Sequence, residues 1–122
     1  MNRGDLVQCG NKYHKGNYIV MGEWVTYDET NPEHQKFHEW LEEDIGRGDI
    51  DGYHYGYGMS KSYNSPRKWI ELMDVERGKP CKMVLCDCWG PRGGSITEWF
   101  EVWESQSGEQ VTGYGYKPEK VV

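Results

Sequence analysis

This chain of 122 residues contains no alanine and no long apolar run. Alanine has the highest intrinsic helix propensity, so its absence argues against a helical bundle. Only 36% of the residues are hydrophobic, and the mean hydropathy is −0.90. No apolar segment approaches the length of a transmembrane helix, and the opening MNRGDLVQCG is too polar for a signal peptide. We therefore expect a soluble, cytoplasmic protein that does not contact a membrane.

Aromatic residues are plentiful and can supply the buried apolar area for which the chain has few aliphatic residues. They form 14% of the chain, with six Trp and nine Tyr. A buried ring removes a large area from water, so rings can build most of a small core. The sixteen Gly favour turns and bent strands. Because no linker-like segment or fixed-period repeat divides the chain, residues 1–122 are expected to form a single domain.

One segment has the pattern of a helix, at about residues 31–45. Asn31 is a suitable N-cap, Pro32 suits the first helical position, and Gly46 suits the C-terminal end. Apolar residues recur between them at helical spacing: Phe37, Trp40, Leu41 and Ile45. This stripe is expected to face the core.

The rest of the chain consists of short strand-like segments separated by turns. The turn sequences RGKP (77–80) and SQSGE (105–109) each separate two such segments, which predicts two hairpins. We predict an α+β fold, in which a curled antiparallel β-sheet of about six to seven short strands packs on the helix at 31–45. From about Lys117 onward the chain is expected to be loose.

Tyrosine and glycine alternate in GYHYGYG (52–58) and again in GYGY (113–116). Alternate side chains of a strand share a face, which groups Tyr53, Tyr55 and Tyr57. If Ser105 pairs with Gln110, a second face carries four rings, although a shift of one residue would invert this grouping: Trp99, Trp103, Tyr114 and Tyr116. These rings are either cross-strand packing, with glycines admitting a neighbouring backbone, or an exposed platform for a ligand or partner.

The acidic residues are concentrated in and around the predicted helix. Residues 28–51 hold nine acidic and two basic residues, and the net charge of the chain is −6. On a helical wheel Glu39, Glu42 and Glu43 lie away from the apolar stripe. This acidic face either serves solubility or docks a protein partner with a basic surface. The small excess of basic residues in 60–82 does not predict direct nucleic-acid binding.

Residues that could carry chemistry are present but do not form a known pattern. His34 and His38 have a spacing that can bind one metal ion, yet no HExxH sequence surrounds them. The four cysteines are expected to be thiols, and the C-x-C spacing is not that of a zinc site: Cys9, Cys81, Cys86 and Cys88. The glycine pattern at 52–58 is not followed by a helix, as a phosphate-binding loop would be. We assign no catalytic residue, metal or cofactor.

The favoured hypothesis is a small binding or inhibitory protein that acts on a protein partner through the acidic helix and the aromatic surface. An origin in a phage or mobile element, with a host nucleic-acid-handling protein as the target, would suit such a protein. The alternative is a protein that binds a nucleotide or sugar on the Tyr/Trp platform. A third hypothesis is a small enzyme or metal protein that uses the helix histidines and the thiols. The oligomeric state is left open.

Overall fold

The computed structural model describes residues 1–11, 14–46, 65–89 and 95–121. Seven strands and one helix follow one another along these residues: β1 (Leu6–Asn11), β2 (His14–Val20), β3 (Val25–Thr26), α1 (Pro32–Gly46), β4 (Ser65–Asp74), β5 (Lys79–Trp89), β6 (Ser95–Glu104) and β7 (Gln110–Lys120). The prediction of an antiparallel sheet with one helix is confirmed in this coarse form. The strands β4 to β7 have 10 or 11 residues each and are longer than expected.

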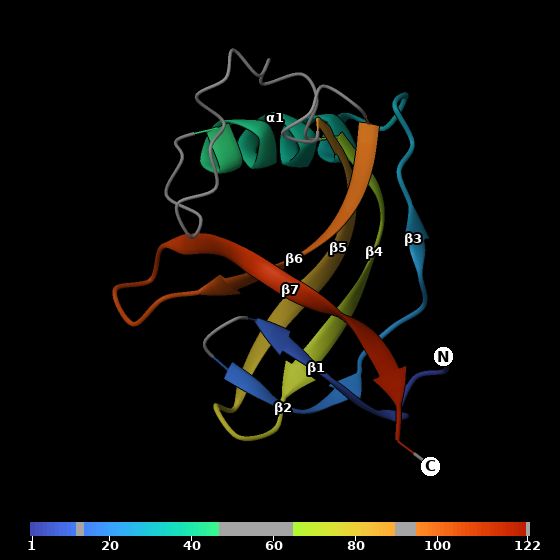
Figure 1. Ribbon diagram of the computed structural model, residues 1–122, viewed down its shortest axis with the longest axis vertical. Coiled ribbons are helices and arrows are strands. Elements are labelled where there is room, and N and C mark those ends of the chain that lie inside the picture. Colours follow the sequence, from blue (N-terminus) through green and yellow to red (C-terminus); the bar gives the residue numbers. More distant parts are fainter. Residues whose placement is uncertain (12–13, 47–64, 90–94, 122) are drawn as a thin grey trace.

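The sheet closes on itself. Its strand order is β2-β1-β7-β6-β5-β4-β3, and β2 also pairs with β4, so six strands form a closed ring while β3 extends the edge of β4. All pairings are antiparallel. The ring is completed where Tyr18 lies opposite Asp74 and Val20 opposite Leu72. In Figure 1 the β4–β5 turn lies at the end of this closed sheet that is distant from α1.

The interior of the closed sheet is filled by side chains that alternate along each strand. Because successive residues of a strand point to opposite faces, each strand contributes every second residue to the interior. The buried interior residues are Val7, Cys9, Tyr18, Val20, Ile70, Leu72, Cys81 and Met83, and three tryptophans pack against them: Trp24, Trp99 and Trp103.

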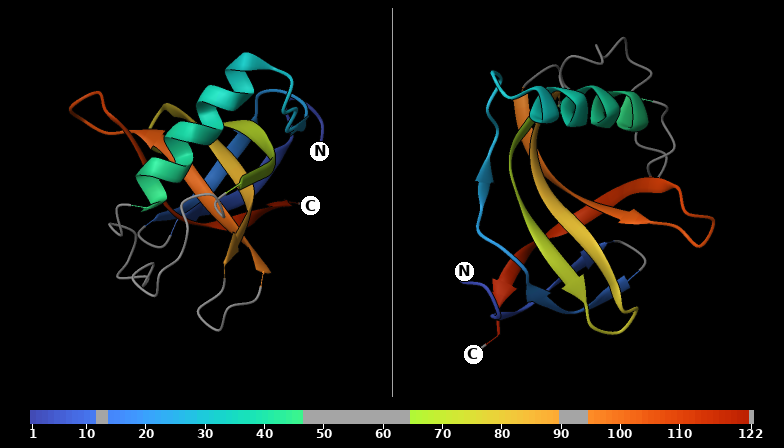
Figure 2. Two further views of the ribbon diagram at one scale, coloured as in Figure 1. Left: turned by 90° about the horizontal axis from the view of Figure 1, so that it is seen from above. Right: turned by 180° about the vertical axis from the view of Figure 1, so that it is seen from behind.

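A second apolar cluster lies on the outer face of the sheet, beneath α1. It joins Leu41 of α1 to residues of β4, β5 and β6: Trp69, Val84, Cys86, Phe100 and Val102. The two views in Figure 2 show α1 lying across this part of the sheet. The helix begins at Pro32 as predicted, where the Asn31 side chain accepts the backbone N–H of Glu33 at 2.9 Å, and it ends one residue later than predicted.

The register of the last hairpin differs from the prediction by one residue. Gln110 pairs with Glu104 and not with Ser105, so Phe100 lies opposite Tyr114. Ser105 belongs to the turn, where its N–H donates to the Glu109 carbonyl at 2.8 Å. Gly108 closes the turn with a φ of +86°, which other residues rarely adopt. The four rings therefore do not share a face, because a one-residue shift moves every side chain of one strand to the other side.

The glycines of the GYGY sequence face the packed interior. A Cβ on Gly115 would lie 2.6 Å from the Met83 sulfur, and one on Gly113 would lie 3.1 Å from the Trp103 ring. Glycine is needed there because the neighbouring side chains occupy the space of a larger residue. This arrangement agrees with the structural explanation of the Tyr-Gly alternation at 113–116. The alternation at 52–58 lies outside the described residues.

The C-terminal segment is also more ordered than expected. β7 continues to Lys120 and pairs with β1, with Gln8 opposite Glu119. The prediction of a loose chain from Lys117 is therefore wrong, because the closed sheet needs this part of β7 as the partner of β1. The lysines and the proline of this segment were misleading, because such residues occur in exposed chain ends and also in strands whose side chains face solvent.

Candidate functional site

Buried polar side chains lie inside the closed sheet at its end distant from α1. Asn11, Asp74 and Glu101 are 2%, 1% and 0% exposed. A buried charge is strongly unfavourable unless it is paired and hydrogen-bonded. The partners of these residues come from β1, β2, the β4–β5 turn and β6, so the cluster exists only when the sheet is closed.

The β4–β5 turn directs Arg77 back toward this cluster. One oxygen of Asp74, Oδ1, accepts the backbone N–H groups of Glu76 at 3.0 Å and of Arg77 at 3.1 Å. Gly78 donates its N–H to the Asp74 carbonyl at 2.8 Å and has a φ of +66°. An Asp that starts a turn and a Gly in the left-handed region are the residue types that such a turn needs.

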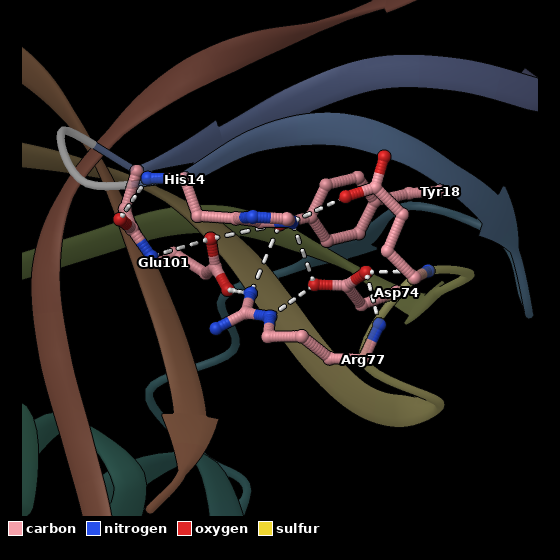
Figure 3. A network of polar contacts seen from close by, with 7 residues as sticks. His14, Tyr18, Asp74, Arg77 and Glu101 are labelled. Carbon is pink, nitrogen blue, oxygen red and sulfur yellow. Dashed lines mark hydrogen bonds and ion pairs between the residues drawn. The ribbon is translucent and has the colours of Figure 1, made fainter.

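Three partners hold the Arg77 guanidinium (Figure 3). Its Nε donates to Asp74 Oδ2, and its Nη2 donates to Glu101 Oε1 at 2.6 Å and to the Tyr18 hydroxyl at 3.0 Å. The hydrogen bonds and ion pairs that the Arg77 side chain makes with the described residues use Nε and Nη2, and none of them uses the remaining nitrogen, Nη1. The guanidinium is thus fixed on two sides, and one donor group is left over.

Glu101 is surrounded by hydrogen-bond donors. Its second oxygen, Oε2, accepts from Asn11 Nδ2 and from the Tyr18 hydroxyl, each at 3.2 Å. Burial raises the pKa of the Glu101 carboxyl, and the bonds from Arg77, Tyr18 and Asn11 oppose that rise. For Asp74 the effect of burial is outweighed by the hydrogen bonds from Arg77, so its pKa is lowered.

His14 at the start of β2 completes the cluster. Its Nε2 lies 3.2 Å from Asp74 Oδ2 and 3.8 Å from Glu76 Oε2. Its backbone N–H donates to Asn11 Oδ1 at 3.0 Å, which fixes the Asn11 amide so that Nδ2 faces Glu101. We call His14, Asn11, Tyr18, Asp74, Arg77 and Glu101 the polar cluster.

A cleft of about 350 Å³ lies beside the polar cluster, between the β4–β5 and β6–β7 turns. Lys79 lies opposite Asp74 in the register, so both side chains belong to the inward face of the sheet. The cleft is lined by Arg77, Lys79, Pro80, Cys81, Trp103, Glu104, Ser105 and Gln106.

The outer surface of the closed sheet carries a row of apolar side chains. The register places one residue from each of four neighbouring strands side by side: Leu6, Ile19, Met73 and Pro80. We call these four residues the apolar row. Leu6 and Ile19 are 40% and 36% exposed. Met21, bonded through its N–H to the Glu71 carbonyl, is a further exposed apolar residue beside the row.

A groove of about 280 Å³ adjoins the apolar row, because Met73 and Pro80 of the row line it. It is lined by Met21, Glu71, Leu72, Met73, Pro80, Cys81, Lys82, Val102, Trp103, Glu104 and Gln110. Lys82 connects the groove to the helix, because its ammonium lies 4.9 Å from the centre of the Phe37 ring of α1. Apolar row, groove and helix are therefore continuous.

The predicted aromatic surface is divided among three environments. Trp99 and Trp103 pack against the interior cluster, whereas Tyr114 stacks on Phe100 in the cluster beneath α1, with ring centres 5.1 Å apart. Only Tyr116 of these four is exposed, and the Lys15 ammonium lies 4.1 Å from its ring centre. Tyr53, Tyr55 and Tyr57 lie outside the described residues.

The acidic helix agrees with the prediction at two of the three positions. Glu39 and Glu43 are exposed. Glu42 is only 21% exposed, because its Oε1 lies 2.6 Å from His38 Nε2. The contact with His38, four residues earlier, holds the Glu42 side chain along the helix surface. A helical wheel shows the direction of each residue but not such a contact between side chains.

The helix histidines pack among rings and backbone groups. His38 Nδ1 lies 3.1 Å from the Tyr27 hydroxyl. His34 accepts the backbone N–H of Asp28 at 3.0 Å and meets the Trp69 ring edge-on, with ring centres 4.9 Å apart. Within the described part of the chain, no group of three or more His, Cys, Asp or Glu residues is arranged to hold a metal ion.

Three cysteines with described side chains are buried free thiols: Cys9, Cys81 and Cys86. Burial raises the pKa of the Cys9 thiol to about 12, with the charge of Glu101 as a further cause, and it raises the pKa of Cys81 as well. A thiol with a raised pKa is a poor nucleophile near neutral pH.

Sequence reasoning missed the polar cluster. No prediction singled out Glu101 or Asp74, and Arg77 entered only as part of the turn sequence RGKP. Two signals in the sequence could have identified it. Glu101 alternates with tryptophans in the segment WFEVW, and DVERG has the Asp and Gly of a tight turn with an arginine between them.

Comparisons of the chain with protein-family models, with curated proteins and with solved structures found no match. The function must therefore be argued from the geometry of the site itself. Among the described residues, no helix is both long enough and apolar enough to cross a membrane.

Proposed function

We propose that the protein is a binding protein that docks another protein on the apolar row and the adjoining groove. The apolar row is the observation that carries this proposal. Singly scattered apolar side chains are normal on a protein surface, but contiguous ones usually mark an interaction site. Here the strand register itself brings Leu6, Ile19 and Met73 side by side on the outer face.

Charge indicates the kind of partner. Glu71 and Glu104 line the groove together with a cation, Lys82. Glu39 and Glu43 of α1 are also exposed. The net charge of the chain is −6. Protein interfaces commonly have an apolar centre and a polar rim. A partner with apolar side chains surrounded by lysine and arginine would match this surface, and charge complementarity would speed its association.

Inhibition is one consequence that such binding can have. A basic surface that matches the acidic helix is the type of surface with which enzymes hold nucleic-acid phosphates. By covering that surface, this chain would compete with the nucleic acid for the same lysines and arginines.

Ile19→Lys tests the proposal because it places a charge at the centre of the apolar row. Thr97→Lys is a matched control, since Thr97 is an exposed residue of β6 that lies opposite Asp87 and not in the row. Capture from a lysate of the native cells, read by quantitative mass spectrometry, compares the two variants with the original chain. We expect a partner that binds the original chain and Thr97→Lys but not Ile19→Lys.

Two measurements complete the test. Urea unfolding should show that both variants are folded, because surface changes usually alter stability by about 0.5 kcal/mol or less. Sedimentation should show the original chain as a monomer, since a dimer that Ile19→Lys dissociates would mean that the row binds a second copy. If Ile19→Lys captures the same proteins as the original chain, the row is not the contact surface.

A further inference from the structure

The cleft between the β4–β5 and β6–β7 turns has the features of a small-molecule site. It borders the proposed docking groove, with which it shares Pro80, Cys81, Trp103 and Glu104. Its volume of about 350 Å³ lies within the range of ligand pockets, and the mouths of closed sheets are frequent positions for such pockets. It also adjoins the polar cluster, and buried ionisable groups next to a cleft are typical of functional sites.

Arg77 offers the first ligand-binding group of this cleft. Asp74, Glu101 and Tyr18 hold its Nε and Nη2, so the guanidinium is oriented before any ligand arrives. Arg77 lines the cleft and its side chain is 29% exposed. Nη1 is the nitrogen left for a ligand, because the bonds of the Arg77 side chain to described residues use Nε and Nη2.

Lys79 offers a second cation. It lies opposite Asp74 in the register and lines the same cleft, and no ion pair joins its ammonium to the described residues. Arg77 and Lys79 line the same cleft from one hairpin, and two cationic donors in one cleft suit a single acidic head group.

The rest of the cleft is apolar or neutral. Pro80, Cys81 and Trp103 form its apolar part, and the turn after β6 adds the neutral polar residues Ser105 and Gln106. The Trp103 ring is held in place, with the Arg77 guanidinium 5.8 Å from its centre. The apolar part of a ligand could therefore pack against the Trp103 ring.

The charges around the cleft select between acidic ligands. The cations Arg77 and Lys79 are balanced by the buried Asp74 and Glu101, and Glu104 stands at the edge. These carboxylates would repel a phosphate dianion about twice as strongly as a ligand with one negative charge, because Coulomb repulsion scales with charge. A single negative charge therefore suits the two nearby donors better. We propose that the cleft binds a small organic monocarboxylate, with its head group between Arg77 Nη1 and Lys79 and its apolar body against Pro80 and Trp103.

Benzoate is a suitable probe, with benzamide as its neutral counterpart and, at about pH 8.5, inorganic phosphate as the dianion. NMR titrations at constant ionic strength would follow the indole signals of Trp103. We expect benzoate to shift them saturably with a dissociation constant of roughly 1–10 mM, as for other small fragments. Benzamide and phosphate should bind at least about tenfold more weakly, because neither presents a single negative charge.

Lys79→Met removes one donor without altering the polar cluster, and it should weaken benzoate binding about tenfold. Lys120→Met is the matched control, because Lys120 lies near Asp5 at the end of β7 and changes the net charge equally. The proposal is wrong if benzoate causes no saturable shift of Trp103, if benzamide binds equally well, or if Lys79→Met binds like the original chain. The benzamide comparison uses the unmodified protein, so it decides the question even if Lys79→Met does not fold.

Discussion

Replacing Arg77 by methionine should destabilise the protein strongly, because it removes the only cation that is bonded to both buried carboxylates in the described structure. Methionine keeps an unbranched side chain of similar length but loses the bonds to Asp74, Glu101 and Tyr18. Glu101 is fully buried and would retain only the donors from Asn11 and Tyr18. Breaking a buried ion pair by removing one partner typically costs about 3–5 kcal/mol.

Urea unfolding followed by tryptophan fluorescence would measure this loss. The whole stability of a domain of this size is about 5–15 kcal/mol, so the variant should remain folded but reach its midpoint at a much lower urea concentration. Arg67→Met is the matched control, because Arg67 pairs with Asp87 on the surface, where the two side chains are 57% and 38% exposed. An exposed pair contributes about 0–1 kcal/mol. Equal losses in the two variants would refute the claim that the polar cluster is an essential part of the fold.

The pH dependence separates the two carboxylates of the cluster. Burial raises the folded-state pKa of Glu101 above its ordinary value of 4.5, so the folded state binds this proton more tightly than the unfolded state does. Stability therefore decreases as pH rises through that window. Asp74 acts in the opposite sense, because its lowered pKa stabilises the fold above 3.8 and that contribution is lost as pH falls.

Glu101→Gln isolates the first of these effects. The variant should lose the decrease in stability above pH 4.5, whereas the loss below the ordinary Asp pKa of 3.8 should persist. Arg77→Met should lose less stability near pH 4 than at pH 7, because without its cation Glu101 protonates more readily. A pH profile for Glu101→Gln that is parallel to that of the original chain over the whole range would show that Glu101 does not titrate in the cluster.

Two further changes test the packing and the charge of the surface. Gly115→Ala should lower the free energy of unfolding, measured in urea, by about 1–3 kcal/mol, because the new Cβ would lie 2.6 Å from the Met83 sulfur. Gly22→Ala is the control and should be close to neutral, because a Cβ there would have no atom within 4 Å. Similar losses for the two variants would contradict the close packing around Gly115. Reversing Glu39 and Glu43 to Lys should leave the fold intact and slow association with a basic partner, and binding by the original chain should weaken as salt rises. Stopped-flow association rates that are unchanged at low salt would limit the acidic helix to a role in solubility.

Local signals predicted the helix well, and long-range pairing is where prediction failed. The Asn31 cap and Pro32 act within one turn, so the sequence shows them directly. The register of β6 and β7 depends on whether Ser105 ends a strand or belongs to the turn, and its bond to Glu109 decides this. Closure of the sheet depends on β2 meeting β4, for which no local pattern exists.

The same limit explains why the polar cluster was missed. Glu101 shares a face with Trp99 and Trp103, and the sequence left open whether that face is packed or exposed. In the structure that face points into the closed sheet, where Arg77 reaches Glu101 from a turn that is distant in the sequence. A charged residue in an apolar strand can therefore be placed correctly only together with its partner.

The polar cluster is difficult to explain by stability alone. Replacing a buried ion pair by well-packed apolar residues is often neutral or stabilising. The two buried carboxylates therefore add little to the free energy of unfolding beyond what apolar side chains in the same positions would give. What the cluster does achieve is position, because it holds the guanidinium of Arg77 at the wall of a cleft. The bonds of the guanidinium to described residues leave Nη1 for a ligand. An oriented donor of this kind favours binding because it need not be ordered when the ligand arrives. The position of Arg77 thus supports a ligand site at the mouth of the closed sheet.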